Sequence, residues 1–376
     1  ETIELHRTVE TGTYTWATIS LAREEAAVEV SIQCDWDDQR PAPGFGGSVR
    51  MPFRMNGDTA SLRADTPYAV SNVEGGGEVS RKYPEGDWMT SPQWFEHVEG
   101  SIVAHSFVDL LDARGAGLLI CHDGSQQWFR RRGGVEVVVD AYCPWDEDRY
   151  DIPWGVFRFA IMPHAPMRDA DRVRFARSCV LEHDEGGWTP PVGGGDPANA
   201  PSIPTTFGAL EVTNADNVLA HAFHRDCMKS GEHLDDWAGH RMATESNGDC
   251  THPFVIRLVE WNGDDADVVL KLPGDIALVA KTNLMGECGL WPAGQTPSDA
   301  PAHLHDTGWL TVEPTIPPEW ARDAMLGEHS ITWSEVRFHM RPREISTIMA
   351  DLVMGRKQVR DLDAKREVWA TIHRTD

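Results

Sequence analysis

The sequence predicts an all-β protein built from β-sandwiches, and two observations lead to this prediction. Apolar and polar residues alternate with period two in many short segments, as they do in strands that bury one face. Gly, Asn and Asp separate these segments at nearly regular spacing, which is typical of turns between antiparallel strands. Long amphipathic helices do not alternate with the strands, so a parallel α/β domain is not expected.

In the first half of the chain, the clearest strand patterns occupy residues 26–36, 105–112, 115–123, 134–142 and 155–164. The opening residues, 1–22, alternate in the same way. In the first of the listed patterns, Val28, Val30 and Ile32 should face one side, toward the core. Cys34 and Trp36 continue that row, whereas Asp35 and Asp37 should face away from it.

In the second half, a strand pattern over 208–226 follows a Gly- and Pro-rich loop at 184–206, and an irregular segment at 228–252 comes next. Strands are predicted over 253–261 and 266–274, and the turn sequence NGDD between them predicts a hairpin. Two strands at 331–340 and 344–354 close the β part. Residues 357–373 have apolar residues at helical spacing, which predicts a short amphipathic helix.

These patterns predict three regions. Residues 1–250 would form a larger β-domain that includes the loop at 184–206. Residues 251–353 would form a second β-sandwich, and residues 354–376 a helical tail.

The charge balance is strongly acidic, with 34 basic and 59 acidic residues and a formal net charge of −25. Such a field disfavours nucleic acid and anionic membrane surfaces as partners. Lys occurs only at positions 82, 229, 271, 281, 357 and 365. A salt-rich cytoplasm and a GC-rich genome both explain an acidic, Lys-poor chain.

Seven cysteines are scattered along the chain, and none forms a C-x-x-C pair. Zinc ribbons and a dense disulfide framework are therefore not expected. Free thiols in a reducing compartment are the simpler interpretation, and we expect a cytoplasmic location.

Two short stretches contain residue types that catalyse reactions or bind metals. In CDWDD, residues 34–38, carboxylates flank an indole, as in many sugar-cleaving sites, but a core tryptophan followed by solvated acids at a strand end gives the same pattern. In HLHD, His303, His305 and Asp306 could bind a metal, since the two histidines share one face if the segment is extended.

Short motifs, weak singly, follow one another from about residue 15 to residue 352. They comprise Asp38 with Pro52 and Phe53; Phe107, Val108 and Asp109; Pro163 and His164; His224 and Arg225; Arg257, Leu258, Glu260 and Gly263; Asn283, Leu284 and Glu287; and Pro342, Glu344, Ile345 and Thr347. In this order they resemble the C-terminal β region of glycoside hydrolase family 38, the α-mannosidases. The chain departs from the pattern at Pro52-Phe53, which stand in reverse order, and at His224-Arg225, where the family has Lys-Lys.

The resemblance implies a mutarotase-like supersandwich followed by a smaller β-sandwich. It also implies retaining hydrolysis of α-mannosides, with a carboxylate nucleophile and a divalent metal, usually zinc. In the family, these groups belong to an N-terminal domain that this chain lacks. No catalytic residue and no metal ligand is therefore expected here, and CDWDD becomes a structural strand end.

The implied role is to complete the sugar pocket and to support the catalytic domain. The expected partners are the N-terminal half of the same enzyme and a mannoside or oligosaccharide, and the isolated chain could self-associate as a homo-oligomer. Two alternatives stay open. One is a stand-alone carbohydrate-binding protein that uses exposed tryptophans. The other is an aldose-epimerase-type enzyme, although the sequence offers no recognisable His/Glu pair for it.

Overall fold

The protein is described here by a computed structural model. It describes residues 2–8, 13–21, 26–36, 48–55, 61–73, 101–124, 127–131, 134–141, 155–180, 210–225, 251–284, 286, 288–289, 291–321, 325–326, 329–330 and 332–353. The loop predicted at 184–206 and the helical tail predicted at 354–376 lie outside these ranges, as does nearly all of the irregular segment 228–252.

The chain divides into two compact units, residues 1–187 and 188–376. The described residues of both units are mainly antiparallel strands, so the predicted all-β class is confirmed. The predicted first domain, 1–250, extends past the first unit and takes in two strands at 211–225 that pair with strands of the second unit. The finer prediction of a mutarotase-like supersandwich stays a proposal.

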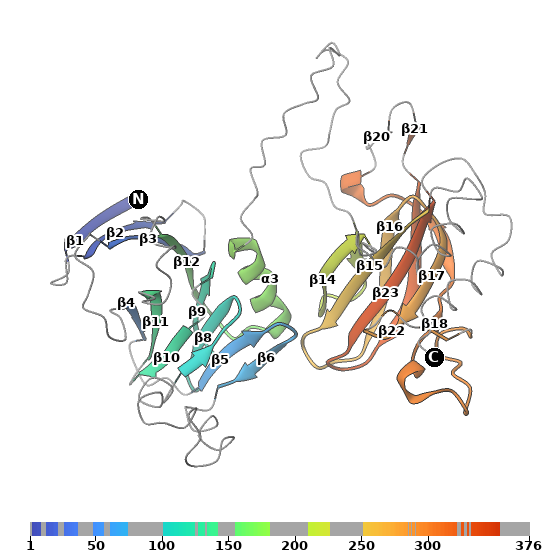
Figure 1. Cartoon of the computed structure of the whole chain (residues 1–376), viewed down its shortest axis with the longest axis horizontal. Coiled ribbons are helices and arrows are strands. Elements are labelled where there is room, and N and C mark those ends of the chain that lie inside the picture. Colours follow the sequence, from blue (N-terminus) through green and yellow to red (C-terminus); the bar gives the residue numbers. More distant parts are fainter. Residues whose placement is uncertain are drawn as a thin grey trace, which may run out of the picture. The chain divides into compact units, whose positions relative to one another are not determined.

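The first unit contains two sheets, whose strands are drawn from blue to green in Figure 1. The eight-stranded sheet has the order β1 (Thr2–Thr8), β2 (Thr13–Ser20), β3 (Val28–Trp36), β12 (Gly155–His164), β9 (Gly117–His122), β8 (Phe107–Leu111), β5 (Ser61–Thr66) and β6 (Ala69–Asn72). The four-stranded sheet has the order β4 (Ser48–Arg54), β11 (Gly134–Ala141), β10 (Gln127–Arg131) and β7 (Ser101–Val103).

The core of the first unit lies between these two sheets. Val30 and Ile32 are buried in it, and Val28 packs against it, which confirms the predicted inward row of β3. The side chains of Cys34, Asp35 and Trp36 lie outside the described part of the structure, as do Asp37 and Asp38. The predictions for the stretch CDWDD therefore stay predictions.

One helix, α3 (Asp169–Val180), packs on β9 and was not predicted. Its sequence nevertheless fits a helix, because Ala170, Val173 and Ala176 repeat every three residues and are all buried. Asp169 and Asp171 occupy the first turn, where negative charge is favourable. The described helices include none that is long and apolar enough to cross a membrane.

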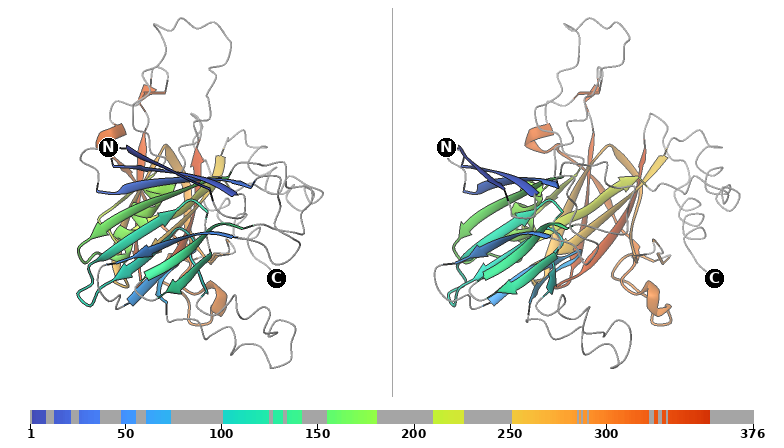
Figure 2. Two further views of the ribbon diagram at one scale, coloured as in Figure 1. Left: turned by 90° about the vertical axis from the view of Figure 1, so that its left-hand side faces the viewer. Right: turned by 60° about the vertical axis from the view of Figure 1, so that its left-hand side comes forward.

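The second unit is also a two-sheet sandwich. One sheet has the order β13 (Glu211–Thr213), β16 (Ala266–Pro273), β22 (Trp333–Met340) and β19 (Val312–Thr315). The other has the order β14 (Val218–Arg225), β15 (Thr251–Glu260), β23 (Ile345–Val353), β17 (Asp275–Thr282) and β18 (Gly308–Trp309). Shorter elements are β20 (Met325–Leu326), β21 (His329–Ser330), and the 3-10 turns η4 (Ala302–Leu304) and η5 (Glu319–Ala321). Figure 2 shows the strands of each unit from two further directions.

The hairpin predicted at NGDD is wrong, because β15 and β16 belong to different sheets. β15 pairs with β14 and β23, whereas β16 pairs with β13 and β22. Ile256 and Leu258 of β15 and Val268 and Leu270 of β16 bury their side chains in the same core. The turn therefore carries the chain from one layer of the sandwich to the other.

Candidate functional site

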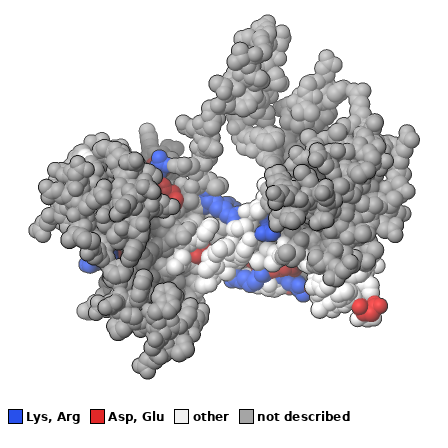
Figure 3. Space-filling model, in the orientation of Figure 1, with Lys and Arg blue, Asp and Glu red and all other residues white. Residues whose placement is uncertain are grey.

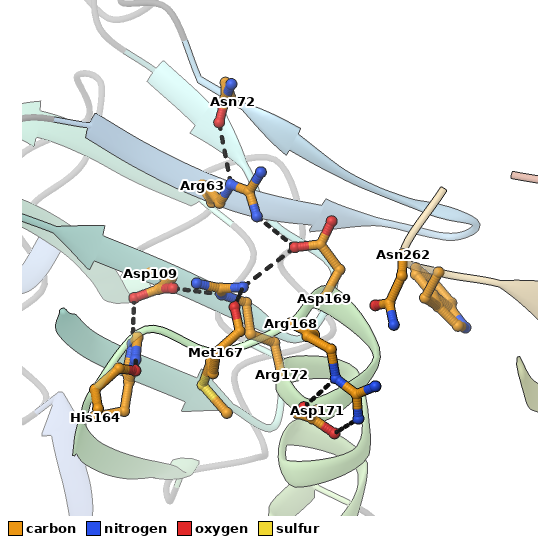
Figure 4. A network of polar contacts seen from close by, with 12 residues as sticks. Arg63, Asn72, Asp109, His164, Met167, Arg168, Asp169, Asp171, Arg172 and Asn262 are labelled. Atoms are coloured by element: carbon orange, nitrogen blue, oxygen red, sulfur yellow. Dashed lines mark hydrogen bonds and ion pairs between the residues drawn. The ribbon is translucent and has the colours of Figure 1, made fainter. Parts of the chain in front are cut away.

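A buried carboxylate in the first unit organises a polar network that joins the sheet to the start of α3 (Figure 4). Asp109 on β8 is fully buried. Its Oδ1 lies 2.9 Å from His164 Nε2, and its Oδ2 accepts a hydrogen bond of 2.6 Å from Arg172 Nε. Asp109 and His164 belong to two of the motifs that carry the family resemblance, whereas Arg172 belongs to the helix that was not predicted.

The network continues from Arg172 along the start of α3. Arg172 Nη1 donates to Asp169 Oδ1 at 3.2 Å and to the carbonyl of Met167. Arg63 of β5 forms an ion pair with the same Asp169 oxygen, and its Nε donates to Asn72 Oδ1 at 3.1 Å. Two arginines thus face two aspartates, so each buried charge has a partner of opposite sign.

His164 contacts an acceptor at each ring nitrogen. Nδ1 lies 2.7 Å from the carbonyl oxygen of Ala165, and Nε2 contacts Asp109. Burial lowers the pKa of His164, but the hydrogen bonds to Asp109 and Ala165 raise it by more than burial lowers it. The pKa of His164 therefore lies above its ordinary value. An imidazolium that donates from both nitrogens fits this geometry. Because neither nitrogen is left for a substrate, the pair serves to join the end of β12 to β8, and Arg172 ties α3 to the same carboxylate.

In the second unit, Glu260 at the end of β15 is buried and accepts four hydrogen bonds. Its donors are Asn217 Nδ2 at 2.9 Å and the backbone N–H groups of Asn262, Gly263 and Arg343, at 2.7, 2.8 and 2.8 Å. Burial raises the pKa of Glu260, but these hydrogen bonds more than reverse that effect and leave the pKa below its ordinary value. Glu260 therefore holds two turns together as a carboxylate.

The motifs of the second unit are in direct contact. The backbone N–H of Glu260 donates to the carbonyl of Glu344 at 3.0 Å, and Arg257 Nη2 donates to the carbonyl of Leu284 at 3.3 Å. Gly263 adopts a φ of 85°, which only a glycine takes up without strain. Glu287 lies outside the described residues. The motif residues that are described thus stabilise turns of the framework.

The predicted metal candidates do not come together. The carbonyl of His303 accepts a hydrogen bond from Asn283 Nδ2 at 3.2 Å, and His305 Nε2 lies 3.1 Å from the carbonyl of Ala300. Asp306 Oδ2 forms an ion pair with Arg341 at 2.9 Å. Among the residues that the structure describes, no group of three or more His, Cys, Asp or Glu side chains could hold a metal ion.

A small cavity of about 180 Å³ lies in the first unit, lined by β2, β3, β9, β12 and Cys179 of α3. Its polar lining includes Ser20, Glu29, Asp123 and Arg158. Ser20 Oγ donates to Glu29 at 3.5 Å, and the backbone N–H of Arg158 donates to Asp123 at 3.1 Å. Carboxylates, hydroxyls and a guanidinium at one place can bind a small polar molecule.

His122 also borders this cavity, but its ring lies next to Trp128 in the core, with ring centroids 5.4 Å apart. Burial, with a smaller contribution from the charge of His105, lowers the pKa of His122 to about 4. A ring held in the core does not act as an acid or base on a molecule in the cavity. The cavity therefore does not supply the His/Glu pair that an epimerase would need.

Sequence reasoning noted Asp109 and His164 only as motif positions and missed Asp169 and Arg172. The available signal was the helical spacing of small and apolar residues after Pro166, with acids at its start and Arg172 four residues after Arg168.

The sequence matches no family model and no curated protein. Similar solved structures include an alpha-mannosidase from Enterococcus faecalis V583, with a TM-score of 0.43 and 13% identity over 90% of this chain and 28% of that chain. Another is a protein in the glycosyl hydrolase family 38 from Enterococcus faecalis, with a TM-score of 0.44 and 10% identity over 90% of this chain and 29% of that chain. This chain spans less than a third of either. At such TM-scores and identities, the similarities decide neither the fold nor the function of this chain.

Proposed function

We propose that this chain is the C-terminal β region of an α-mannosidase-like retaining glycosidase, an enzyme that hydrolyses α-mannosides. In this role it completes the sugar pocket and supports a catalytic domain supplied by an N-terminal part of the same enzyme. The observation that carries the proposal is the ordered set of family motifs, of which those around Glu260, Leu284 and Glu344 contact one another.

These contacts support the proposal because they depend on the residue types that define the motifs. A carboxylate at position 260 satisfies three backbone N–H groups that would otherwise be partly buried without acceptors. A glycine at position 263 allows the positive φ of the turn. The resemblance therefore rests on the residues that maintain the framework of the second unit.

The chemistry also favours a catalytic centre in another part of the enzyme. Retaining hydrolysis needs a nucleophilic carboxylate about 5 Å from a carboxylic acid that donates a proton. Glu260 and Glu344 both have lowered pKa values and are held by hydrogen bonds, so neither suits a proton donor. The described residues also do not fit the family's divalent metal.

The test is the release of nitrophenol from an aryl α-mannoside, in the presence of zinc or cobalt. We expect no turnover by the purified chain and turnover when it is mixed with the separately produced N-terminal part. Metal-dependent turnover by the chain alone, lost on the double substitution His303→Ala and His305→Ala, would contradict the proposal and make the HLHD loop the site.

A second candidate function is carbohydrate binding without catalysis, which the polar cavity beside Arg158 favours. Titration calorimetry with mannose would detect it, and Arg158→Ala should remove the binding. Binding by the isolated chain, with no gain of turnover on adding the N-terminal part, would favour this candidate over the first.

A further inference from the structure

Two cysteines from different elements of the first unit meet at the cavity. Cys121 lies on β9 and is fully buried, whereas Cys179 lies in the last turn of α3 and is exposed. Neither is part of a disulfide, and both line the cavity of about 180 Å³. The packing of α3 on β9 brings them together, although they lie far apart in the sequence.

Both side chains border the same cavity, so the two thiols lie near each other. Burial, and after it the influence of the Cys179 side chain, raises the pKa of Cys121 well above its ordinary value. Cys179 is therefore the thiol that a reagent in solution reaches first. To form a disulfide, the two sulfur atoms must approach each other to about 2.05 Å. Cys179 is the exposed partner, so its side chain is the one that moves toward the buried Cys121.

We propose that Cys121 and Cys179 form a reversible disulfide that fastens the end of α3 to β9, and that the cavity gives a small oxidant access to them. This site is independent of the proposed glycosidase role. It is a covalent modification site, and its oxidant is a peroxide such as hydrogen peroxide.

The reaction proceeds in two balanced steps. The sulfur of Cys179 attacks one peroxide oxygen, the O–O bond breaks, and the products are a sulfenic acid and one water molecule. The sulfur of Cys121 then attacks the sulfenic sulfur, the S–S bond forms, and the S–O bond breaks to release a second water molecule. Together the two thiols lose two electrons and two protons, and hydrogen peroxide accepts both.

The disulfide would stabilise the contact between α3 and the sheet. It closes a loop that contains β12 and the first turns of α3, where Asp169 and Arg172 join the buried network. Cross-linking restricts the unfolded chain, so the oxidised protein should melt several degrees above the reduced one. A dithiol reagent should reverse the rise.

The test is peptide mapping of the full chain after treatment with hydrogen peroxide and tryptic digestion without reductant. The tryptic peptides 115–130 and 178–225 each contain one cysteine, Cys121 and Cys179. We expect these two peptides to be joined, two hydrogen atoms lighter than their sum, and separated again by a dithiol.

Cys179→Ser removes an exposed side chain and should fold normally, so it serves as the main variant. It should lose both the cross-link and the rise in melting temperature. Cys288→Ser, which replaces a buried cysteine in the second unit, is the matched control and should keep both. A cross-link of either peptide to another cysteine would overturn the proposal, as would a singly oxidised Cys179 beside a free Cys121.

Discussion

His122 is buried in the core of the first unit, and neither of its ring nitrogens has a hydrogen-bond partner among the residues that the structure describes. Burial and the charge of His105 lower its pKa to about 4, from an ordinary value of 6.5. Between these two pH values the unfolded chain binds a proton at this position and the folded chain does not. Stability should therefore be lost as the pH falls from about 6.5 toward 4.

Replacing His122 with Phe should remove this dependence. The full shift corresponds to about 3 kcal/mol, since one pKa unit is worth about 1.4 kcal/mol. The free energy of unfolding, measured in urea at several pH values, should fall less steeply below pH 6.5 in His122→Phe than in the unchanged protein. Parallel curves for the two proteins would show that His122 is already protonated, or has found a partner, in the folded state.

Glu260 offers a second test, because its carboxylate accepts four hydrogen bonds. In Glu260→Gln, an NH₂ group replaces one oxygen and faces donors instead of accepting from them. We expect a loss of about 2–4 kcal/mol, since hydrogen bonds to buried charged groups are the costly ones to break. The exposed Glu313→Gln in the same unit is the control and should change stability by no more than about 0.5 kcal/mol. Equal effects of the two substitutions in thermal or urea unfolding would contradict this role of Glu260.

Sequence reasoning chose other acidic residues than these. It selected Asp35, Asp37 and Asp38 because they flank Trp36, and Asp306 because it follows two histidines. Asp109 was noted only as the last residue of a strand motif. Strand alternation shows that a residue faces away from one core, but it does not show that a helix covers the other face.

At the scale of elements, the attachment of α3 to the sheet depends on the buried pair of Asp109 and Arg172. Breaking such a pair from one side leaves an unpaired buried charge, which costs about 3–5 kcal/mol. Replacing both partners with apolar residues of similar size should cost much less. His164, at the end of β12, pairs with the same carboxylate and stabilises this network while it is protonated. Since its pKa is raised, this contribution is present below pH 6.5 and fades as the pH rises through the raised value.

A double-mutant cycle measures this pair. Asp109→Leu and Arg172→Met should each destabilise the protein strongly in urea unfolding, and the double variant should recover much of the loss. Arg174→Met is a control on the exposed face of α3, where Arg174 pairs with the partly exposed Asp171. If the two single losses simply add in the double variant, Asp109 and Arg172 do not stabilise the protein as a pair.

The strands were predictable and their partners were not. The predicted strands at 155–164 and 266–274 agree with β12 and β16 to within a residue, because alternation is a local property of the chain. Whether two strands joined by a short turn pair with each other depends on distant residues. At NGDD, Glu260 binds both its own turn and the N–H of Arg343, and the chain crosses to the opposite sheet. Residues far apart in the sequence decide that outcome.

At the scale of the whole molecule, charge is the dominant property. The chain has a formal net charge of −25 and few lysines. Figure 3 shows basic and acidic side chains on the described surface, in places next to one another. The pattern of strands could not reveal where the chain divides, because both units are β-sandwiches. The division at residues 187 and 188 follows from which strands share a sheet.

The acidic excess predicts that salt stabilises the protein. Like charges repel in the compact state, and salt shortens the range of this repulsion, to about 10 Å at 0.1 M and about 3 Å at 1 M. The midpoint of thermal unfolding should therefore rise from dilute buffer to molar KCl. A rise that stops at a few tenths molar would be explained by screening alone, whereas a rise that continues to molar KCl would favour adaptation to a salt-rich cytoplasm over a merely GC-rich genome. Sucrose at matched osmolality is the control, since it acts without screening charge. A midpoint that stays flat or falls as KCl is added would count against both forms of the prediction.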